Sequence, residues 1–181
     1  MIYPNNFESK IGFDKIRELI IHNCLSTLGE ERVAQLAFSN IFADINIALC
    51  QTDEFMHILQ EDVDFPISYF IDARPALSKI RIHGTWIEES ALFDLRRSLQ
   101  TIQDIVNFLT KEDAENTAYP YLFQLAEDVA IFPKLIKEID NILDKFGRIK
   151  DSASPELNKI RREKTQVAGS ISKKLSSILS A

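Results

Sequence analysis

Apolar residues recur at steps of three and four along most of this chain, and this spacing constrains the fold more than any other feature. Such steps return a side chain to the same face of an α-helix, whereas a strand requires strict alternation. The chain has only 5 glycines and 6 prolines among 181 residues, so it is poor in the turn residues that strand-rich folds use. The sequence therefore predicts an all-α fold.

The predicted helices bury the apolar stripe that each one carries. We expect Leu19 and Leu49 to point inward, and Trp86 and most of the 12 phenylalanines to pack in a core. Tyr119 or Tyr121 would be the aromatic residue left exposed for base stacking. One small β-hairpin is expected near 145–151. The helices are expected near residues 7–11, 14–24, 27–37, 45–59, 72–84, 88–109, 122–126, 132–143 and 155–181.

The last predicted helix differs from the others, because nothing follows it. Ser154 is a suitable N-cap and Pro155 fits the first helical position. A narrow apolar stripe of this kind needs a partner helix, so we expect either a truncated sequence or pairing with another chain. We divide the chain into a helical core domain, residues 1–150, and the start of a coiled-coil helix, residues 151–181. The stripe comprises Leu157, Ile160, Val167, Ile171, Leu175 and Ile178, with Lys164 interrupting it.

Charge is unevenly distributed along the chain. The net charge is −6, and residues 1–150 hold 15 basic and 24 acidic side chains, so the remaining segment is basic. An acidic core does not attract nucleic acid by bulk charge. The candidates for phosphate contact are therefore Arg161, Arg162, Lys173 and Lys174. We expect Arg161 and Lys173 to flank the apolar stripe, and Arg162 and Lys174 to lie near one face. The alternative interpretation is that all four are solvated flanks of a coiled coil.

No pattern of catalytic or metal-binding residues is present. His22, His57 and His83 are far apart and lack metal-ligand spacing, so no metal site is expected. Cys24 and Cys50 lie within helical patterns, which predicts small buried side chains in a reducing cytoplasm. No run approaches the roughly 20 apolar residues of a membrane span, and no nucleophile motif occurs. The sequence predicts a cytoplasmic protein that catalyses nothing by itself.

Residues 147–163 read Gly-Arg-Ile-Lys-Asp-Ser-Ala-Ser-Pro-Glu-Leu-Asn-Lys-Ile-Arg-Arg-Glu. This run resembles the entry into the long lever helices of the MutS type-two family, bacterial MutS paralogues without a mismatch-reading domain. Asp72-Ala73-Arg74-Pro75-Ala76-Leu77 is similar to the D-I-R-P-x-L stretch of the same family, with Ala73 in place of an aliphatic residue. Residues 13–16 and 28–29 look like the opening of the family. The resemblance extends over nearly the whole chain.

The resemblance implies more than the residues themselves do. Family members are homodimers in which a helical core and lever arms precede an ATPase domain and, usually, an Smr nuclease-like domain. They act on branched DNA and suppress recombination, and some act on collided ribosomes. This chain has no G-x-x-x-x-G-K-[ST] motif. ATP and Mg²⁺ would therefore bind in a part of the parent protein outside this chain.

Two hypotheses follow. In the first, the chain is a non-catalytic scaffold that couples the ATPase of its parent to nucleic-acid engagement, and Leu157, Ile160, Ile171 and Leu175 seat the lever against its partner. In the second, the basic terminal helix binds branched DNA or ribosomal RNA directly. The expected partners are the rest of the parent chain, a second copy, and DNA or the ribosome through the parent, with no membrane.

Overall fold

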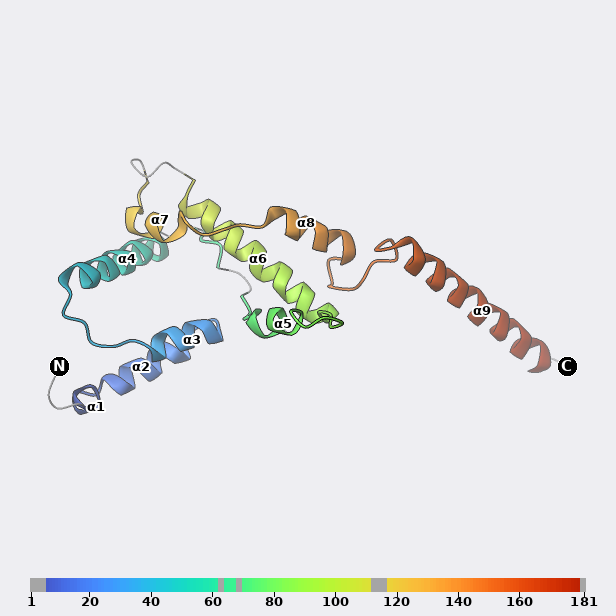
Figure 1. Cartoon of the computed structure of the whole chain (residues 1–181), viewed down its shortest axis with the longest axis horizontal. Helices are drawn as coiled ribbons and strands as arrows, with labels where there is room; N and C mark the ends of the chain where they lie inside the picture. Colours follow the sequence, from blue (N-terminus) through green and yellow to red (C-terminus); the bar gives the residue numbers. More distant parts are fainter. Residues whose placement is uncertain (1–5, 62–63, 68–69, 112–116, 180–181) are drawn as a thin grey trace.

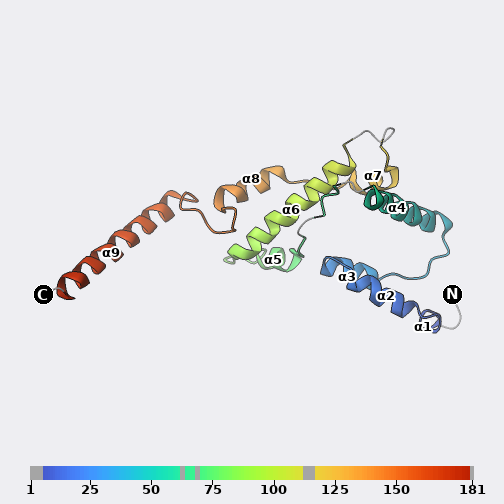
Figure 2. The same cartoon turned by 180° about the vertical axis from the view of Figure 1, so that it is seen from behind.

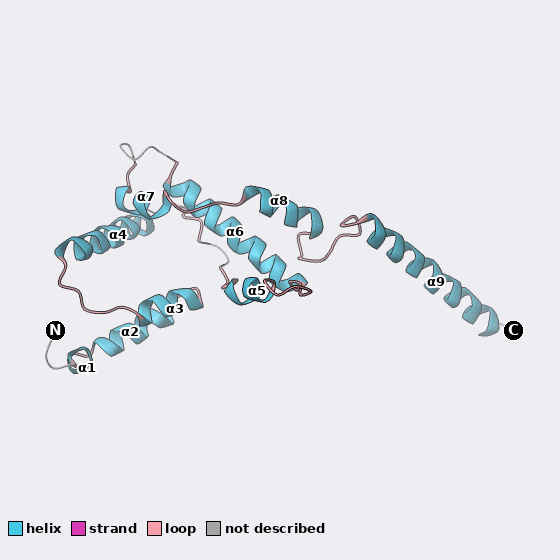
Figure 3. Ribbon diagram, in the orientation of Figure 1, coloured by secondary structure: helices cyan, strands magenta, loops and turns pink. Residues whose placement is uncertain are grey.

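The computed structural model of the chain describes residues 6–61, 64–67, 70–111 and 117–179. Within these ranges the regular structure is entirely α-helical (Figure 3), so the predicted all-α fold with a long last helix is confirmed. The helices are α1 (Phe7–Lys10), α2 (Phe13–His22), α3 (Thr27–Ala34), α4 (Phe42–Gln60), α5 (Arg74–Lys79), α6 (Glu89–Leu109), α7 (Pro120–Ala126), α8 (Pro133–Ile142) and α9 (Pro155–Leu179).

The helices form three parts (Figures 1 and 2). Helices α1 to α3 pack on one another as an N-terminal unit. Helices α4 to α8 form a second part, the helical body, in which α6 packs against α7 and α8, and α4 packs against α7. Helix α9 runs away from the body, and no extensive packing joins its described residues to another helix.

The core of the helical body lies where α4, α6 and α7 meet. Ile58 of α4 is fully buried there, against Leu109 of α6 and Ala126 of α7. Phe65 extends this cluster, with ring centroids 5.2 Å from Phe55 and 5.1 Å from Phe108 in edge-to-face geometry, the arrangement that aromatic quadrupoles favour. A second buried group, on the α8 side, consists of Ile136, Ile139 and Leu143.

Much apolar surface is uncovered in this structure. A compact monomer of 20.7 kDa would expose about 8,900 Å², whereas this chain exposes 14,210 Å². The prediction that Leu19, Leu49 and Trp86 point inward is wrong, because their exposed fractions are 62%, 63% and 69%. The apolar faces exist as the periodicity requires, but no other part of the described chain covers them.

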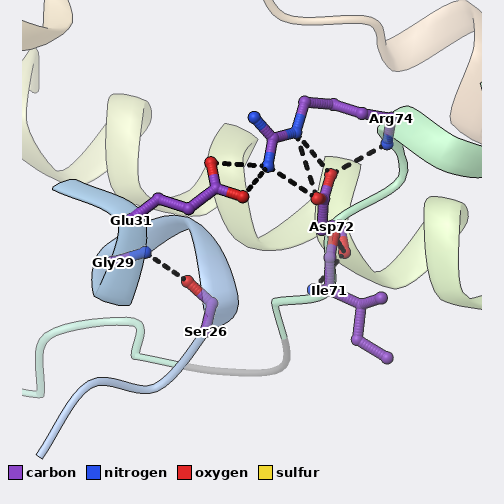
Figure 4. A network of polar contacts seen from close by, with 7 residues as sticks. Ser26, Gly29, Glu31, Ile71, Asp72 and Arg74 are labelled. Atoms are coloured by element: carbon purple, nitrogen blue, oxygen red, sulfur yellow. Dashed lines mark hydrogen bonds and ion pairs between the residues drawn. The ribbon is translucent and has the colours of Figure 1, made fainter. Parts of the chain in front are cut away.

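Local side-chain hydrogen bonds stabilise the starts of two helices, α3 and α5. Ser26 is the N-cap of α3, and its hydroxyl accepts the Gly29 N–H at 3.2 Å. At α5 the Asp72 carboxylate accepts the Arg74 N–H at 2.9 Å. The Arg74 guanidinium also reaches Glu31 of α3 at 2.8 Å, which links the N-terminal unit to the body (Figure 4). Both side chains are more than half exposed, so this ion pair is a weak, solvent-screened link.

Cys24 and Cys50 are free thiols and only half-buried, so the prediction of buried side chains is wrong for both. Cys50 lies on α4, and Cys24 lies in the connection between α2 and α3. Among the described residues, no helix combines the length and apolar composition needed to cross a bilayer.

Candidate nucleic-acid interface and lever helix

The segment between α8 and α9, residues 143–154, forms a polar joint. Leu143 and Ile149 form an isolated antiparallel bridge, so the predicted hairpin shrinks to a single bridged turn. The Asp144 carboxylate accepts the N–H groups of Phe146 at 2.8 Å and Arg148 at 2.9 Å. These backbone hydrogen bonds, the Arg148 one foremost, lower the pKa of Asp144 because they favour its charged form. Gly147 completes the turn with a φ of 79°.

The joint is held against the helical body from two sides. On the α6 side, Glu89 accepts the Ile149 N–H at 2.6 Å, and Gly147 lies so close to the Phe93 ring that no Cβ would fit. On the α8 side, the Lys150 N–H donates to the Ile142 carbonyl at 2.8 Å. The joint is therefore fixed by backbone hydrogen bonds, which favour one direction for the chain as it leaves the body.

An ion pair joins α6 and α8, the two helices that contact the joint. Arg96 of α6 donates to both carboxylate oxygens of Asp140 on α8, at 2.7 and 2.9 Å. This bidentate geometry is the strong form of an arginine–carboxylate pair. It lowers the pKa of Asp140, chiefly through the Arg96 hydrogen bonds, and raises the pKa of Arg96.

Helix α9 begins as the sequence predicts. The Ser154 hydroxyl accepts the Leu157 N–H at 3.1 Å, and Pro155 is the first helical residue. Arg161, two turns along, turns back to the joint, where it donates to the Ile149 carbonyl at 3.0 Å and forms an ion pair with Asp151. Arg161 is therefore the side chain of α9 that holds the helix to the joint.

The four candidate phosphate contacts do not form one surface. Arg161 is occupied by the joint, whereas Arg162, Lys173 and Lys174 are exposed and form no ion pair within the described residues. Twelve helical residues rotate a side chain by about 120° beyond three full turns. Arg162 and Lys174 therefore do not share a face, and that prediction is wrong. The same geometry puts Lys174, not Lys173, beside the apolar stripe.

The apolar stripe of α9 is open to solvent along most of its length. Leu157 is half-buried near the joint, but Ile160, Ile171 and Leu175 are each more than half exposed. No residue of α9 is buried. The role predicted for these four side chains, seating the lever on a partner, remains a prediction that requires a surface outside this helix.

The three histidines and the two candidate stacking tyrosines lie apart from one another in the described part of the chain. No three His, Cys, Asp or Glu side chains converge there on a point that could hold a metal ion. His22, His57 and His83 are exposed on α2, on α4 and in the turn after α5. Tyr119 and Tyr121, the candidates for stacking, are half-buried.

Two features of the body were not identified from the sequence. Glu54 on α4 is buried, and its carboxylate accepts the N–H groups of Tyr121 at 3.0 Å and Leu122 at 2.8 Å, so it caps α7 from another helix. Beside it lies a cavity of about 290 Å³ between α4, α6 and α7, lined by apolar residues alone. The apolar stripe of α6 forms one wall of this cavity and was predicted from the sequence. No local sequence pattern indicates that α4, α6 and α7 leave a space between them.

Comparison with known proteins relates the chain to MutS2 proteins. It is 28% identical over 169 residues to a protein named Endonuclease MutS2 from Geobacillus sp. (strain WCH70). It is 26% identical over 171 residues both to Endonuclease MutS2 of Alkaliphilus oremlandii (strain OhILAs) and to Putative endonuclease MutS2 of Bacillus subtilis (strain 168). No protein-family model matches the chain.

These similarities extend over nearly all of this chain but only a small part of each relative. They cover 93% or 94% of the chain and 21% or 22% of the three proteins. The chain therefore spans about a fifth of their length. It is similar to one region of MutS2 proteins and does not correspond to a full-length endonuclease.

Proposed function

We propose that this chain is the helical core and the start of a lever in a larger MutS-type DNA-handling ATPase, and that it acts as a non-catalytic scaffold. The observation that carries the proposal is α9, a helix of 25 residues that leaves the body through a hydrogen-bonded joint with its apolar stripe uncovered. Such a helix is about 37 Å long, so a small rotation at the joint becomes a large displacement at its far end.

The joint is suited to passing motion between the two parts. Arg161 links α9 to Asp151 and Ile149, and Ile149 is in turn bound by Glu89 at the first turn of α6. A displacement of α6 therefore reaches α9 through one chain of polar contacts. Leu157, Ile160, Ile171 and Leu175 then seat the lever on its partner, so that the far end responds to the body.

The remaining parts of the proposal concern the whole protein. ATP and Mg²⁺ bind in an ATPase domain outside this chain, which itself needs no cofactor. The parent acts as a homodimer in the cytoplasm, on branched DNA or on ribosomes, and suppresses recombination. The similarity to proteins named Endonuclease MutS2 supports a role connected with nucleic acid.

The test is made in a full-length protein that contains this region. Arg161→Ala removes the link between α9 and the joint, so we expect DNA to lose its effect on ATP hydrolysis while the basal rate is retained. Lys159→Ala removes an exposed charge of the same helix that is not among the candidate phosphate contacts, and it is the matched control. Normal DNA stimulation in the Arg161→Ala protein would refute the proposal.

A second candidate function is direct nucleic-acid binding by α9. The observation that favours it is the exposure of Arg162, Lys173 and Lys174, which have no ion-pair partner in the described residues. Phosphate contacts of this kind are independent of sequence and weaken steeply with salt. A band-shift titration of the chain on four-way junction DNA distinguishes the two functions. Absence of binding at about 50 mM salt rejects direct binding.

A further inference from the structure

Contacts between its two ends hold the N-terminal unit, α1 to α3, together. Arg17 of α2 donates to the Glu8 carboxylate on α1 at 2.9 Å and to the Leu36 carbonyl after α3 at 2.9 Å. Just beyond, the Phe38 ring packs edge-to-face on Phe7 of α1, with ring centroids 5.8 Å apart. Because these contacts join the start of the unit to its end, α1 to α3 can move as one body.

The connection from this unit to the helical body is short. Residues 39–41 separate Phe38, which is bound to the unit, from α4, the first helix of the body. Within this stretch the Ile41 N–H donates to the Ser39 hydroxyl at 3.2 Å. Among the described residues, no helix of the unit packs extensively on a helix of the body. Rotation of the backbone at residues 39–41 can therefore reorient the unit without breaking a packed interface.

On the body side, Arg74 is held in place independently of Glu31. Ser98, buried on α6, accepts the Ile71 N–H at 2.9 Å and donates to the Ile71 carbonyl at 3.3 Å. One residue further on, Asp72 accepts the Nε–H of Arg74 on its two carboxylate oxygens, at 2.9 and 3.0 Å. Figure 4 shows the guanidinium between the carboxylates of Asp72 and Glu31. The body thus presents this guanidinium to α3 in a fixed position.

The contact between Arg74 and Glu31 can separate at little cost. A single guanidinium nitrogen, Nη2, contacts both oxygens of Glu31 and one oxygen of Asp72, each at 2.8 Å. Since Asp72 still neutralises Arg74 after Glu31 has left, separation leaves no unpaired charge on the body. The Glu31 side chain is already 52% exposed, so its carboxylate returns readily to water. Ion pairs of this kind are weak and are screened by salt.

We propose that Glu31 and Arg74 form an electrostatic latch, which holds α1 to α3 against the body at low ionic strength and releases the unit to turn about residues 39–41 when salt screens the pair. The screening length falls from about 10 Å at 0.1 M salt to about 3 Å at 1 M, so the latch responds within this range. The latch belongs to the N-terminal unit and does not depend on the role proposed for α9.

The two cysteines of the chain supply the reporter. Cys24 lies in the unit, between α2 and α3, and Cys50 lies on α4 in the body, both as free thiols. With a nitroxide label on each, pulsed electron resonance measures the distances between them. We expect one population for the held arrangement and a broader one for the released arrangement. Circular dichroism checks that the labelled chains keep their helices.

Substitution of the latch should shift the balance between these populations. Glu31→Gln should lower the ratio of held to released chains about two- to fivefold, the range expected for an exposed ion pair. Glu30→Gln removes the same charge at an exposed neighbouring position of α3, so it is the matched control and should leave the ratio unchanged. An unchanged ratio in the Glu31→Gln chain would overturn the proposal.

Salt dependence and charge exchange complete the test. Between about 0.05 and 1 M salt the ratio should fall in the unaltered chain and stay constant in the Glu31→Gln chain. Glu31→Arg should release the unit because like charges then face each other, and adding Arg74→Glu should restore the held population. Equal salt dependence in the unaltered and Glu31→Gln chains, or a double variant that stays released, would also contradict the latch.

Discussion

Helices α6 and α9 have similar sequence patterns and opposite surroundings. Both carry an apolar stripe at steps of three and four residues over more than 20 residues. The stripe of α6 is at least half-buried, because α7 and α8 pack on this helix. Its last residue, Leu109, belongs to the core cluster. Along α9 no residue is buried. Periodicity thus identifies the apolar face of a helix but does not say whether the same chain covers it.

Buried polar side chains are found in the helical body, whereas no residue of α9 is buried. In the body, Ser98 of α6 is buried and accepts the Ile71 N–H at 2.9 Å, and buried Glu54 accepts two N–H groups of α7. Such groups contribute stability only while their partners remain, because an unpaired buried group loses its solvation. On α9 the polar side chains can turn to water. We therefore expect the free energy of unfolding to be concentrated in the body.

The largest expected effect compares isoleucines in the two regions. Ile58 is fully buried, so Ile58→Ala should lower the free energy of unfolding by about 2–5 kcal/mol through lost apolar burial and a residual cavity. Ile171→Ala on α9 makes the same chemical change at a 52% exposed site and should change it by less than about 0.5 kcal/mol. Urea unfolding at a concentration where the chain is monomeric measures both. Equal losses would contradict the contrast.

The next largest effect compares alanine substitutions at two glycines, which should change the stability of the protein in opposite directions in the two regions. A Cβ at Gly147 would lie 2.6 Å from Cγ of Phe93, and φ there is +79°. Gly147→Ala should therefore destabilise the protein by about 2–4 kcal/mol, from left-handed backbone strain and overpacking. Gly169 of α9 has open space around it, and Gly169→Ala should stabilise that helix by up to about 1 kcal/mol. Thermal unfolding followed by circular dichroism tests the sign of each change.

A third, somewhat smaller effect tests the cap that α4 supplies to α7. Glu54→Ala leaves the N–H groups of Tyr121 and Leu122 without their acceptor. We expect a loss of about 1–3 kcal/mol and faster hydrogen exchange at those two amides. Asp53→Ala, an exposed neighbour on the same helix, is the control and should change little. Unchanged exchange at Tyr121 in the Glu54→Ala protein would show that the cap does not stabilise α7.

The sequence predicted what depends on neighbouring residues. The helix positions, the Ser154 cap and the first helical position of Pro155 all follow from local chemistry, and the structure has them. It did not predict the cap of α7, because Glu54 lies 67 positions before Tyr121. The prediction for Trp86 failed for the related reason that its burial depends on a distant surface. Of the candidate site, the sequence identified the basic residues of α9 but not the engagement of Arg161 with the joint.

The smallest effect concerns the ion pair beneath the joint and depends on pH. Asp140 is partly exposed, so Asp140→Asn should cost only about 0.5–1 kcal/mol at neutral pH. Because Arg96 lowers the pKa of Asp140 below its ordinary value of 3.8 in the folded protein, the stabilisation is complete above that value and is lost as the pH falls through the lowered pKa.

The unaltered and Asp140→Asn chains should therefore differ in urea midpoint at neutral pH and converge as the pH falls below the lowered pKa of Asp140. Asp128→Asn, an exposed carboxylate of the body without an ion pair in the described residues, controls for the change in net charge. A difference that persists in acid would mean that the Asn side chain disturbs packing between α6 and α8. The packing of α6 on α8 beneath the joint would then depend on side-chain shape, and the Arg96–Asp140 charges would contribute little to its stability.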